Sequence, residues 1–64
     1  MTTTYTVLED QPKLDRWDVA IRTFPTLAKA EAFLRRRYTA AERAGEDDMC
    51  QPHIRNDASG EYVS

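Results

Sequence analysis

The chain has 64 residues, with nine Lys and Arg against eleven Asp and Glu, and its formal net charge is -2. This balance excludes the strongly basic profile of a dedicated nucleic-acid-binding domain, and it is too weakly acidic for a DNA mimic. A chain of this length forms a single domain, 1-64, and buries only about 60% of the surface that its unfolded form exposes. A deep catalytic cleft is therefore not expected.

Cysteine usage and the first residues indicate the compartment. Cys50 is the single cysteine, so no internal disulfide can form, and one free thiol fits a reducing cytoplasm. Residues 1–4 lack the basic and apolar regions of a signal peptide, and no apolar run approaches the roughly 20 residues that span a bilayer. We therefore expect a cytoplasmic protein without a membrane segment.

Two strands are predicted before any helix. Residues 3–9 are rich in Thr, Tyr and Val, and residues 16–24 place Trp17, Val19 and Ile21 at a period of two. Pro12 lies between these segments in a polar stretch. It predicts a hairpin loop rather than a tight two-residue turn.

Alternation assigns the side chains of these strands to two faces of the sheet. Trp17 and Tyr5 have the parity that suits a core covered by the helix. Phe24 and Leu8 have the opposite parity, so we expect them on the uncovered face, as a small apolar patch for a partner or a second copy. Tyr62 could extend this patch or close the core, and both interpretations stay open.

One helix is predicted to follow the second strand. Thr26 is a good N-cap, strong helix formers come after it, and Gly45 can adopt the left-handed conformation beyond the last turn. A helix over 27–44 presents one broad apolar arc of the kind that covers a sheet. The arc comprises Leu27, Ala30, Phe33, Leu34, Tyr38, Ala41 and Ala44.

The rest of the chain predicts a third strand near 53–56 and a turn at 57–60, after which 61–63 could return as a fourth strand. The fold class is therefore α+β, a small antiparallel sheet of three, possibly four, strands with one α-helix packed on one face, in the chain order β-β-α-β(-β). Placing the first strand in the middle gives an all-antiparallel order 2-1-3. A mixed sheet with a right-handed crossover is the alternative. Either sheet has unpaired edges, which are a template for a partner strand or a homodimer.

The charged side chains separate into a basic group on the predicted helix and an acidic group directly after it. The acidic run lacks the alternating ligands and central glycine of a calcium loop, so it is a solvated loop or an acidic contact patch. Arginines and opposed charges can anchor and orient a protein partner. The candidate partner contacts are Arg35, Arg36, Arg37, Arg43, Glu46, Asp47, Asp48 and Phe24.

An alternative function uses a second basic set. Lys29, Arg36 and Arg43 are spaced seven residues apart, so one continuous helix would align them along one flank. Such a line can hold phosphates, although neither aromatic stacking partners for bases nor a groove-reading motif accompanies it. A small nucleic-acid-binding domain is therefore the alternative to a protein-binding module.

Arg37 falls within the predicted apolar arc of the helix. Its stem can snorkel to water where the helix overhangs the sheet. The other interpretations are an ion pair with Glu9 or Asp18, or an anchor that stays free for a partner.

Cys50 and His53 form a Cys-x-x-His pair. A structural zinc site draws four ligands from two such pairs, and the second pair is missing. A cysteine nucleophile with this histidine as its base would lack an orienting third group. We therefore expect no metal, no cofactor and no catalytic residue, and an enzyme built on this pair is the least favoured class.

The run Phe24-Pro25-Thr26-Leu27-Ala28-Lys29-Ala30-Glu31-Ala32, which follows a Trp-containing strand, resembles the strand-to-helix junction of small sheet-plus-helix domains such as the arm-type DNA-binding domains of phage integrases. Those domains place three strands before the helix and are usually basic, so their DNA-binding role is not carried over. In size and layout the chain is also similar to small phage-encoded inhibitors of host defence, such as anti-CRISPR proteins, without a shared motif.

The sequence predicts a non-enzymatic binding module that occupies the surface of another protein or protein complex. A small phage-type inhibitor, anti-CRISPR-like in layout, or an accessory subunit fits this interpretation. Affinity would come from a few aromatic and arginine anchors.

Overall fold

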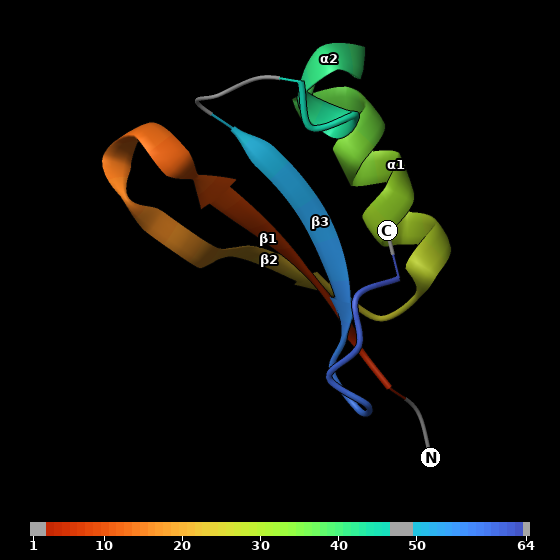
Figure 1. Ribbon diagram of the computed structural model, residues 1–64. Coiled ribbons are helices and arrows are strands. Elements are labelled where there is room, and N and C mark those ends of the chain that lie inside the picture. Colours follow the sequence, from red (N-terminus) through yellow and green to blue (C-terminus); the bar gives the residue numbers. More distant parts are fainter. Residues whose placement is uncertain (1–2, 47–49, 64) are drawn as a thin grey trace.

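The computed structural model describes residues 3–46 and 50–63 of the chain. Its strands are β1 (Tyr5–Gln11), β2 (Arg16–Phe24) and β3 (Gln51–Asn56), and its helices are α1 (Leu27–Arg37) and α2 (Ala40–Arg43), with a 3-10 turn, η1 (Pro12–Leu14), between the first two strands. The sheet has the order β2-β1-β3 with antiparallel pairs throughout. This confirms the α+β class and the all-antiparallel arrangement, and Figure 1 shows α1 against one side of the sheet.

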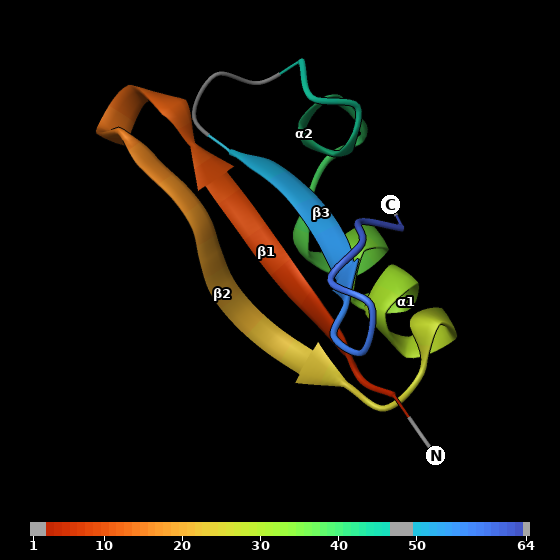
Figure 2. The same cartoon turned by 60° about the horizontal axis from the view of Figure 1, so that its bottom comes forward.

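The core lies between the sheet and α1. Val7 from the central strand and Ile54 from β3 are fully buried, and Ala30, Leu34 and Tyr38 cover them from the helical side. Residues 6–9 of the central strand are buried in succession, so side chains on both of its faces are covered, whereas β2 is largely exposed. In Figure 2 the β1–β2 hairpin extends beyond β3 and the helices, so its tip lies away from the core.

The predicted single helix over 27–44 is wrong, because the helix divides at Tyr38. Tyr38 is extended, with φ -120° and ψ 147°, and α2 starts after Thr39. Thr39 accepts from the backbone N–H of Glu42, and Glu42 accepts from the N–H of Thr39, which is a complete capping box. The box stabilises a new helix start inside a stretch of strong helix formers, and the bend points Tyr38 into the core.

The predicted helix end at Gly45 is confirmed. Gly45 has φ 76°, its N–H donates to the carbonyl of Glu42, and the N–H of Glu46 donates to the carbonyl of Ala41. This is the Schellman pattern, in which a left-handed residue satisfies the last carbonyls of a helix.

Two β-bulges interrupt β2. Ile21 is an extra residue between the pairs Val7↔Arg22 and Leu8↔Ala20, and a second extra residue lies at Trp17 and Asp18, which both face the single position of Asp10. An extra residue reverses the parity of every side chain beyond it. Strict alternation therefore fails twice in this strand.

The bulges correct two of the sequence predictions. Trp17 is 59% exposed and not in the core as predicted. Phe24 pairs with Tyr5 and packs on Phe33 of α1, with ring centroids 5.1 Å apart, so its predicted place on the uncovered face is wrong. Tyr5 packs against the core as predicted.

The face of the sheet opposite α1 is called the far face here, and Leu8, Ala20 and His53 lie on it as directly paired neighbours. Leu8 is on this face as predicted, but it is only 1% exposed. It therefore contributes no surface patch.

The C-terminal residues lie along the outer edge of β3. Asn56 and Val63 donate backbone hydrogen bonds to Glu61 and Ile54, at 2.8 Å each, and Tyr62 forms an isolated bridge with Arg55. The possible fourth strand is thus a single bridge, and it carries Tyr62 onto the far face next to His53, with ring centroids 4.7 Å apart.

Candidate functional site

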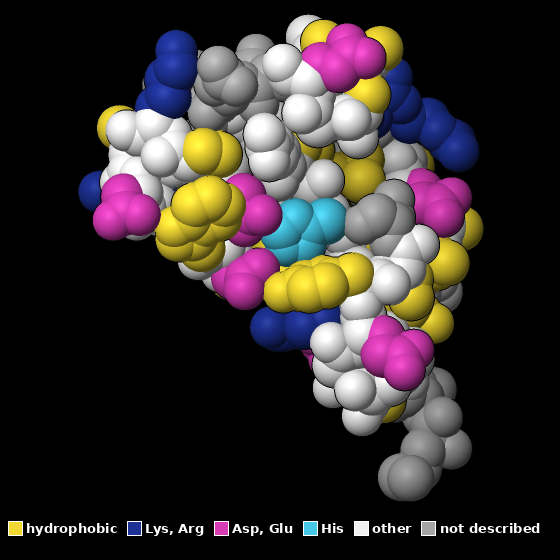
Figure 3. Space-filling view, viewed as in Figure 1, with side chains coloured by type: hydrophobic (Ala, Val, Ile, Leu, Met, Phe, Trp, Pro, Cys, Tyr) yellow, Lys and Arg dark blue, Asp and Glu magenta, His cyan; other side chains and the backbone are white. Residues whose placement is uncertain are grey.

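A pocket of about 420 Å³ lies on the far face, near the loop end of the β1–β2 hairpin. Figure 3 shows the single histidine, in cyan, next to acidic side chains in magenta and hydrophobic side chains in yellow. The lining residues come from β1, β2, β3 and the C-terminal segment. They are Asp10, Trp17, Asp18, His53 and Tyr62, which together are called the Trp17 pocket.

Local backbone geometry places Trp17 at the rim. Asp15 after η1 and Asp18 in the bulge both have left-handed backbone, with φ 52° and 51°. Asp tolerates this conformation better than most residues, and strained backbone of this kind clusters at functional sites. The indole Nε1 of Trp17 donates to Oδ1 of Asp15 at 3.2 Å, which fixes the ring while 59% of the residue stays exposed.

Asp18 organises the floor of the pocket. Its Oδ1 accepts from the hydroxyl of Tyr62 at 2.8 Å and lies 3.0 Å from Nε2 of His53, which must donate because a carboxylate can only accept. These bonds from Tyr62 and His53 lower the pKa of Asp18 below its ordinary value of 3.8. Oδ1 of Asp10 in turn accepts from the backbone N–H of Asp18 at 2.9 Å.

Asp10, Asp18 and His53 offer three ligand atoms within 4.8 Å of one another, which makes them the group in the described part of the chain that could hold a metal ion. The contacts of His53 do not favour this use. Its Nε2 lies on Asp18, whereas its Nδ1 is 3.8 Å from Oδ2 of Asp10. The Asp18 and Asp10 carboxylates therefore lie beside different nitrogens of His53. A metal ion would need one nitrogen and both carboxylates directed at the same point.

A second polar cluster lies on the opposite side of the sheet, under the helices. Glu9 is 7% exposed and accepts from the hydroxyl of Tyr38 at 2.7 Å and from the side-chain amide of Gln11. Burial raises the pKa of Glu9, but hydrogen bonds from Tyr38, Gln11 and Cys50, with the charge of Arg37, outweigh it and lower the pKa below 4.5. These hydrogen bonds surround the buried Glu9 carboxylate, and the cluster therefore stabilises the core.

Arg37 belongs to this cluster through Tyr38. Its Nε lies 3.4 Å from the hydroxyl of Tyr38, its guanidinium carbon is 5.6 Å from the ring centroid, and its side chain is exposed. The guanidinium therefore acts on Glu9 across the tyrosine hydroxyl. Among the described residues Arg37 forms no direct ion pair with Glu9 or Asp18, so that interpretation is wrong, and its exposed guanidinium reaches Glu9 only through the Tyr38 hydroxyl.

Cys50 and His53 are not brought together. Cys50 bonds to Glu9 on the helix side, whereas His53 bonds to Asp18 on the far face. Burial, then the hydrogen bond and charge of Glu9, raise the pKa of the Cys50 thiol to about 12. A thiol in this state has almost no thiolate at neutral pH, so the arrangement lacks an activated nucleophile at Cys50.

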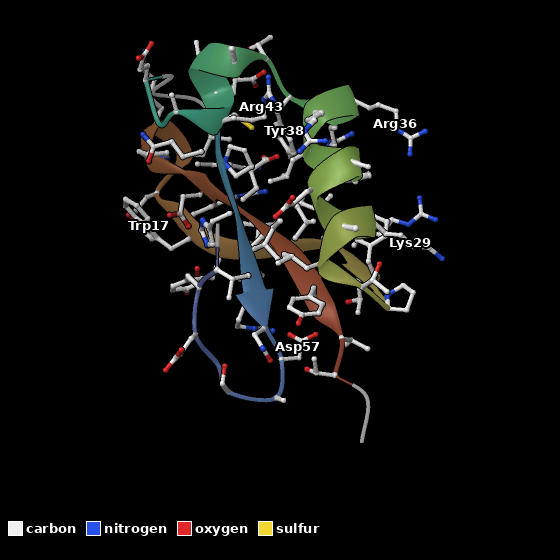
Figure 4. The ribbon with its side chains drawn as sticks, turned by 90° about the vertical axis from the view of Figure 1, so that its right-hand side faces the viewer. Trp17, Lys29, Arg36, Tyr38, Arg43 and Asp57 are labelled. Carbon is white, nitrogen blue, oxygen red and sulfur yellow. The ribbon has the colours of Figure 1, made fainter. Side chains whose placement is uncertain are left out.

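The basic residues do not form the line expected from a continuous helix. Figure 4 shows Lys29 and Arg36 on the outer side of α1, pointing away from the sheet, whereas Arg43 comes from α2 beyond the bend. Nε of Arg43 donates to the backbone carbonyl of Thr39 at 3.4 Å. The division of the helix therefore separates the three predicted phosphate contacts.

Arg35 and Arg43 instead line a smaller pocket of about 240 Å³ with Glu31, Leu34 and Pro52. Oε2 of Glu31 lies 3.8 Å from Nη2 of Arg35, so this carboxylate offsets part of the positive charge in the smaller pocket. Of the predicted acidic contacts, Glu46 is exposed, while Asp47 and Asp48 lie outside the described residues.

The sequence did not predict the Trp17 pocket. Trp17 was assigned to the core, and Asp10, Asp18 and Tyr62 were not linked to one another. A signal was present in Asp15-Arg16-Trp17-Asp18, because two aspartates around an aromatic residue can supply left-handed backbone that reverses the strand parity.

Within residues 3–46 and 50–63, neither helix has the length and apolar character needed to cross a membrane. Comparisons of the chain with protein-family models, with curated proteins and with solved structures gave no match.

Proposed function

We propose that this protein is a non-enzymatic binding module that acts by occupying the surface of a protein partner, as an inhibitor or an accessory subunit. The observation that carries the proposal is the Trp17 pocket. The two aromatic residues at its rim, Trp17 and Tyr62, are 59% and 55% exposed, yet each donates a hydrogen bond to an aspartate that holds its ring in place.

Such rigid, exposed aromatics are costly in a free protein and useful in a bound one. Trp and Tyr are enriched among the residues that dominate binding energy, and a ring that is already fixed loses little conformational freedom on binding. The pocket also lies on the face that α1 leaves uncovered, so a partner can reach it without disturbing the core. A partner covering this face would bury both rings.

The cytoplasm is the proposed compartment. The support is Cys50, a free and half-buried thiol whose raised pKa keeps it protonated and slow to oxidise.

The proposal is tested by capture with matched variants. Trp17→Ala removes the larger rim residue, whereas Leu14→Ala removes an equally exposed apolar side chain, at 56%, from the tip of the same hairpin. Tagged wild-type, Trp17→Ala and Leu14→Ala proteins are used to enrich interactors from the source organism, with quantitative mass spectrometry as the readout. A protein enriched by wild type and Leu14→Ala, and lost with Trp17→Ala, is the expected result.

Purified partner then gives the affinity by calorimetry. We expect Trp17→Ala to weaken binding by at least about 2 kcal/mol, the range of an interface hot spot, and Leu14→Ala to leave it nearly unchanged. Equal enrichment and equal affinity for all three proteins would show that the pocket is not the contact surface.

Nucleic-acid binding through Lys29, Arg36 and Arg43 has weaker support, because Arg43 is separated from the other two by the bend at Tyr38. Fluorescence polarisation with labelled DNA and RNA at low salt tests it. Salt-sensitive binding that Lys29→Ala and Arg36→Ala reduce would favour this alternative.

A further inference from the structure

We infer that the Trp17 pocket binds the side chain of an arginine presented by the partner. This inference rests on the proposed function and gives the chemistry of the contact. Among the described residues the pocket is lined by two carboxylates, one imidazole and two aromatic rings, with no Lys or Arg. A cation is therefore the complementary ligand.

The aromatic rims favour a planar cation. A cation over the face of Trp or Tyr is attracted by the ring, and tryptophan is the strongest of these partners. A guanidinium can also stack flat on an indole while an N–H at its edge donates to a carboxylate oxygen, whereas an ammonium has no flat face to stack. Trp17, Asp18 and Tyr62 line the same pocket, where Asp18 accepts from the Tyr62 hydroxyl and directly follows Trp17 in the chain, so one bound side chain can contact a ring and the Asp18 carboxylate.

Asp18 is the carboxylate best placed to receive this ligand. Its side chain is 52% exposed, whereas that of Asp10 is 22% exposed. Tyr62 and His53 both bond to Oδ1 and hold the carboxylate in one orientation before any ligand arrives. A group that is already oriented loses less entropy on binding.

Arg55, the arginine whose charge acts on Asp18, does not fill this role. Arg55 is close enough to act electrostatically on Asp18, but its Nε donates to Oδ1 of Asp57 at 3.2 Å. Asp57 is itself fixed by the hydroxyls of Thr4 and Thr6, at 2.6 and 2.7 Å. Arg55 is thus paired with the carboxylate of Asp57 and lies outside the pocket lining.

The chain supplies its own probes for a test. Trp17 is the single tryptophan and His53 the single histidine, so tryptophan fluorescence and the NMR signals of the indole N–H and imidazole report on the pocket. The ligands are blocked tripeptides with one central residue between glycines, which is arginine, its uncharged isostere citrulline, or lysine. Each is titrated into the full-length protein at low salt.

We expect saturable changes in both probes with the arginine peptide, at least about tenfold weaker binding of citrulline, and about threefold weaker binding of lysine. The absence of a saturable change up to about 10 mM arginine peptide overturns the inference. Equal affinity for arginine and citrulline overturns the role of charge, and equal affinity for arginine and lysine overturns the assignment of a planar cation.

Asp18→Asn is the matched variant, because asparagine tolerates the left-handed backbone and its Oδ1 can still accept from Tyr62 and His53, while the charge and the second acceptor oxygen are lost. This substitution should weaken binding of the arginine peptide at least about fivefold. Circular dichroism should show an unchanged fold. Glu31→Gln removes a carboxylate of α1 that lies outside the pocket lining and should leave affinity unchanged. A loss with Glu31→Gln and none with Asp18→Asn would contradict the inference.

The two proposals fail in different ways. If Trp17→Ala abolishes partner capture while Asp18→Asn retains it, the pocket binds by apolar contact, so this inference is wrong and the proposed function stands. If Trp17→Ala retains partner capture, the pocket is not the contact surface and this inference is wrong, whereas a wild-type protein that captures no partner overturns the proposed function.

Discussion

Glu9 shows how one buried carboxylate is accommodated in a very small core. A buried charge without donors is strongly unfavourable, and Glu9 lies next to the central apolar residue Leu8. Tyr38, Gln11 and Cys50 each give it a hydrogen bond. Among the described residues, every buried side-chain nitrogen and oxygen has a partner. The cluster therefore links the central strand, α1 and the start of β3.

Removing one of these donors should destabilise the fold. Tyr38→Phe keeps the ring in the core but leaves Glu9 without its hydroxyl donor, and we expect a loss of about 1–3 kcal/mol in the free energy of unfolding. Urea denaturation followed by circular dichroism measures it.

Tyr5→Phe is the control for this substitution, because it removes a tyrosine hydroxyl outside the Glu9 cluster. It should change the free energy of unfolding by a few tenths of a kcal/mol. Equal stability of Tyr38→Phe and wild type would mean that the bond to Glu9 contributes nothing net.

At the scale of elements, the chain uses one local motif to end a helix that its composition would continue. The residues from Leu27 to Ala44 favour a helix throughout, yet Thr39 and Glu42 satisfy each other's backbone N–H groups and start α2. The bend places Tyr38 over Glu9. A pattern of apolar residues every three or four positions could not reveal this, since it is compatible with both a straight and a divided helix.

The capping box provides a test at this scale. Thr39→Ala removes the hydroxyl acceptor and should lower the free energy of unfolding by about 0.5–2 kcal/mol. Thr39→Ser keeps an acceptor at the same position and should stay close to wild type. Similar losses for both substitutions, measured in urea, would show that the γ-methyl group of Thr39 matters and the hydrogen bond does not.

Strand β2 likewise has features that a local sequence pattern could not reveal. Its period-two pattern predicted the strand and its bounds, because alternation persists locally between bulges. The faces of Trp17 and Phe24 could not be predicted, since each bulge depends on pairing with a strand that the local sequence does not contain. The candidate site was missed for this reason, as it exists only where the reversed parity of Trp17 meets Tyr62 from the other end of the chain.

On the scale of the whole molecule, acid should destabilise the protein. Glu9 and Asp57 have pKa values below their ordinary 4.5 and 3.8 in the fold, Glu9 through its hydrogen bonds despite burial and Asp57 through the hydroxyls of Thr4 and Thr6. A lowered pKa in the folded state stabilises the protein above the unfolded pKa, and this stability is lost as pH falls through the folded pKa.

We therefore expect the urea midpoint to be nearly constant from neutral pH down to about pH 5 and to fall steadily below about pH 4.5. Glu31→Gln removes a carboxylate that pairs with Arg35 within α1. The urea midpoint of this variant should still fall at acid pH, as in the wild type. A midpoint that rises on acidification below pH 4.5 would contradict the lowered pKa values.

The two bulges of β2 also affect how the protein behaves among copies of itself. Within the described residues no strand pairs with the outer edge of β2. A flat edge of this length invites stacking into fibrils, but an irregular one twists away and cannot continue a repeating ladder with an identical strand. The strand that displays the indole is therefore poorly suited to form a repeating edge-to-edge ladder with copies of itself.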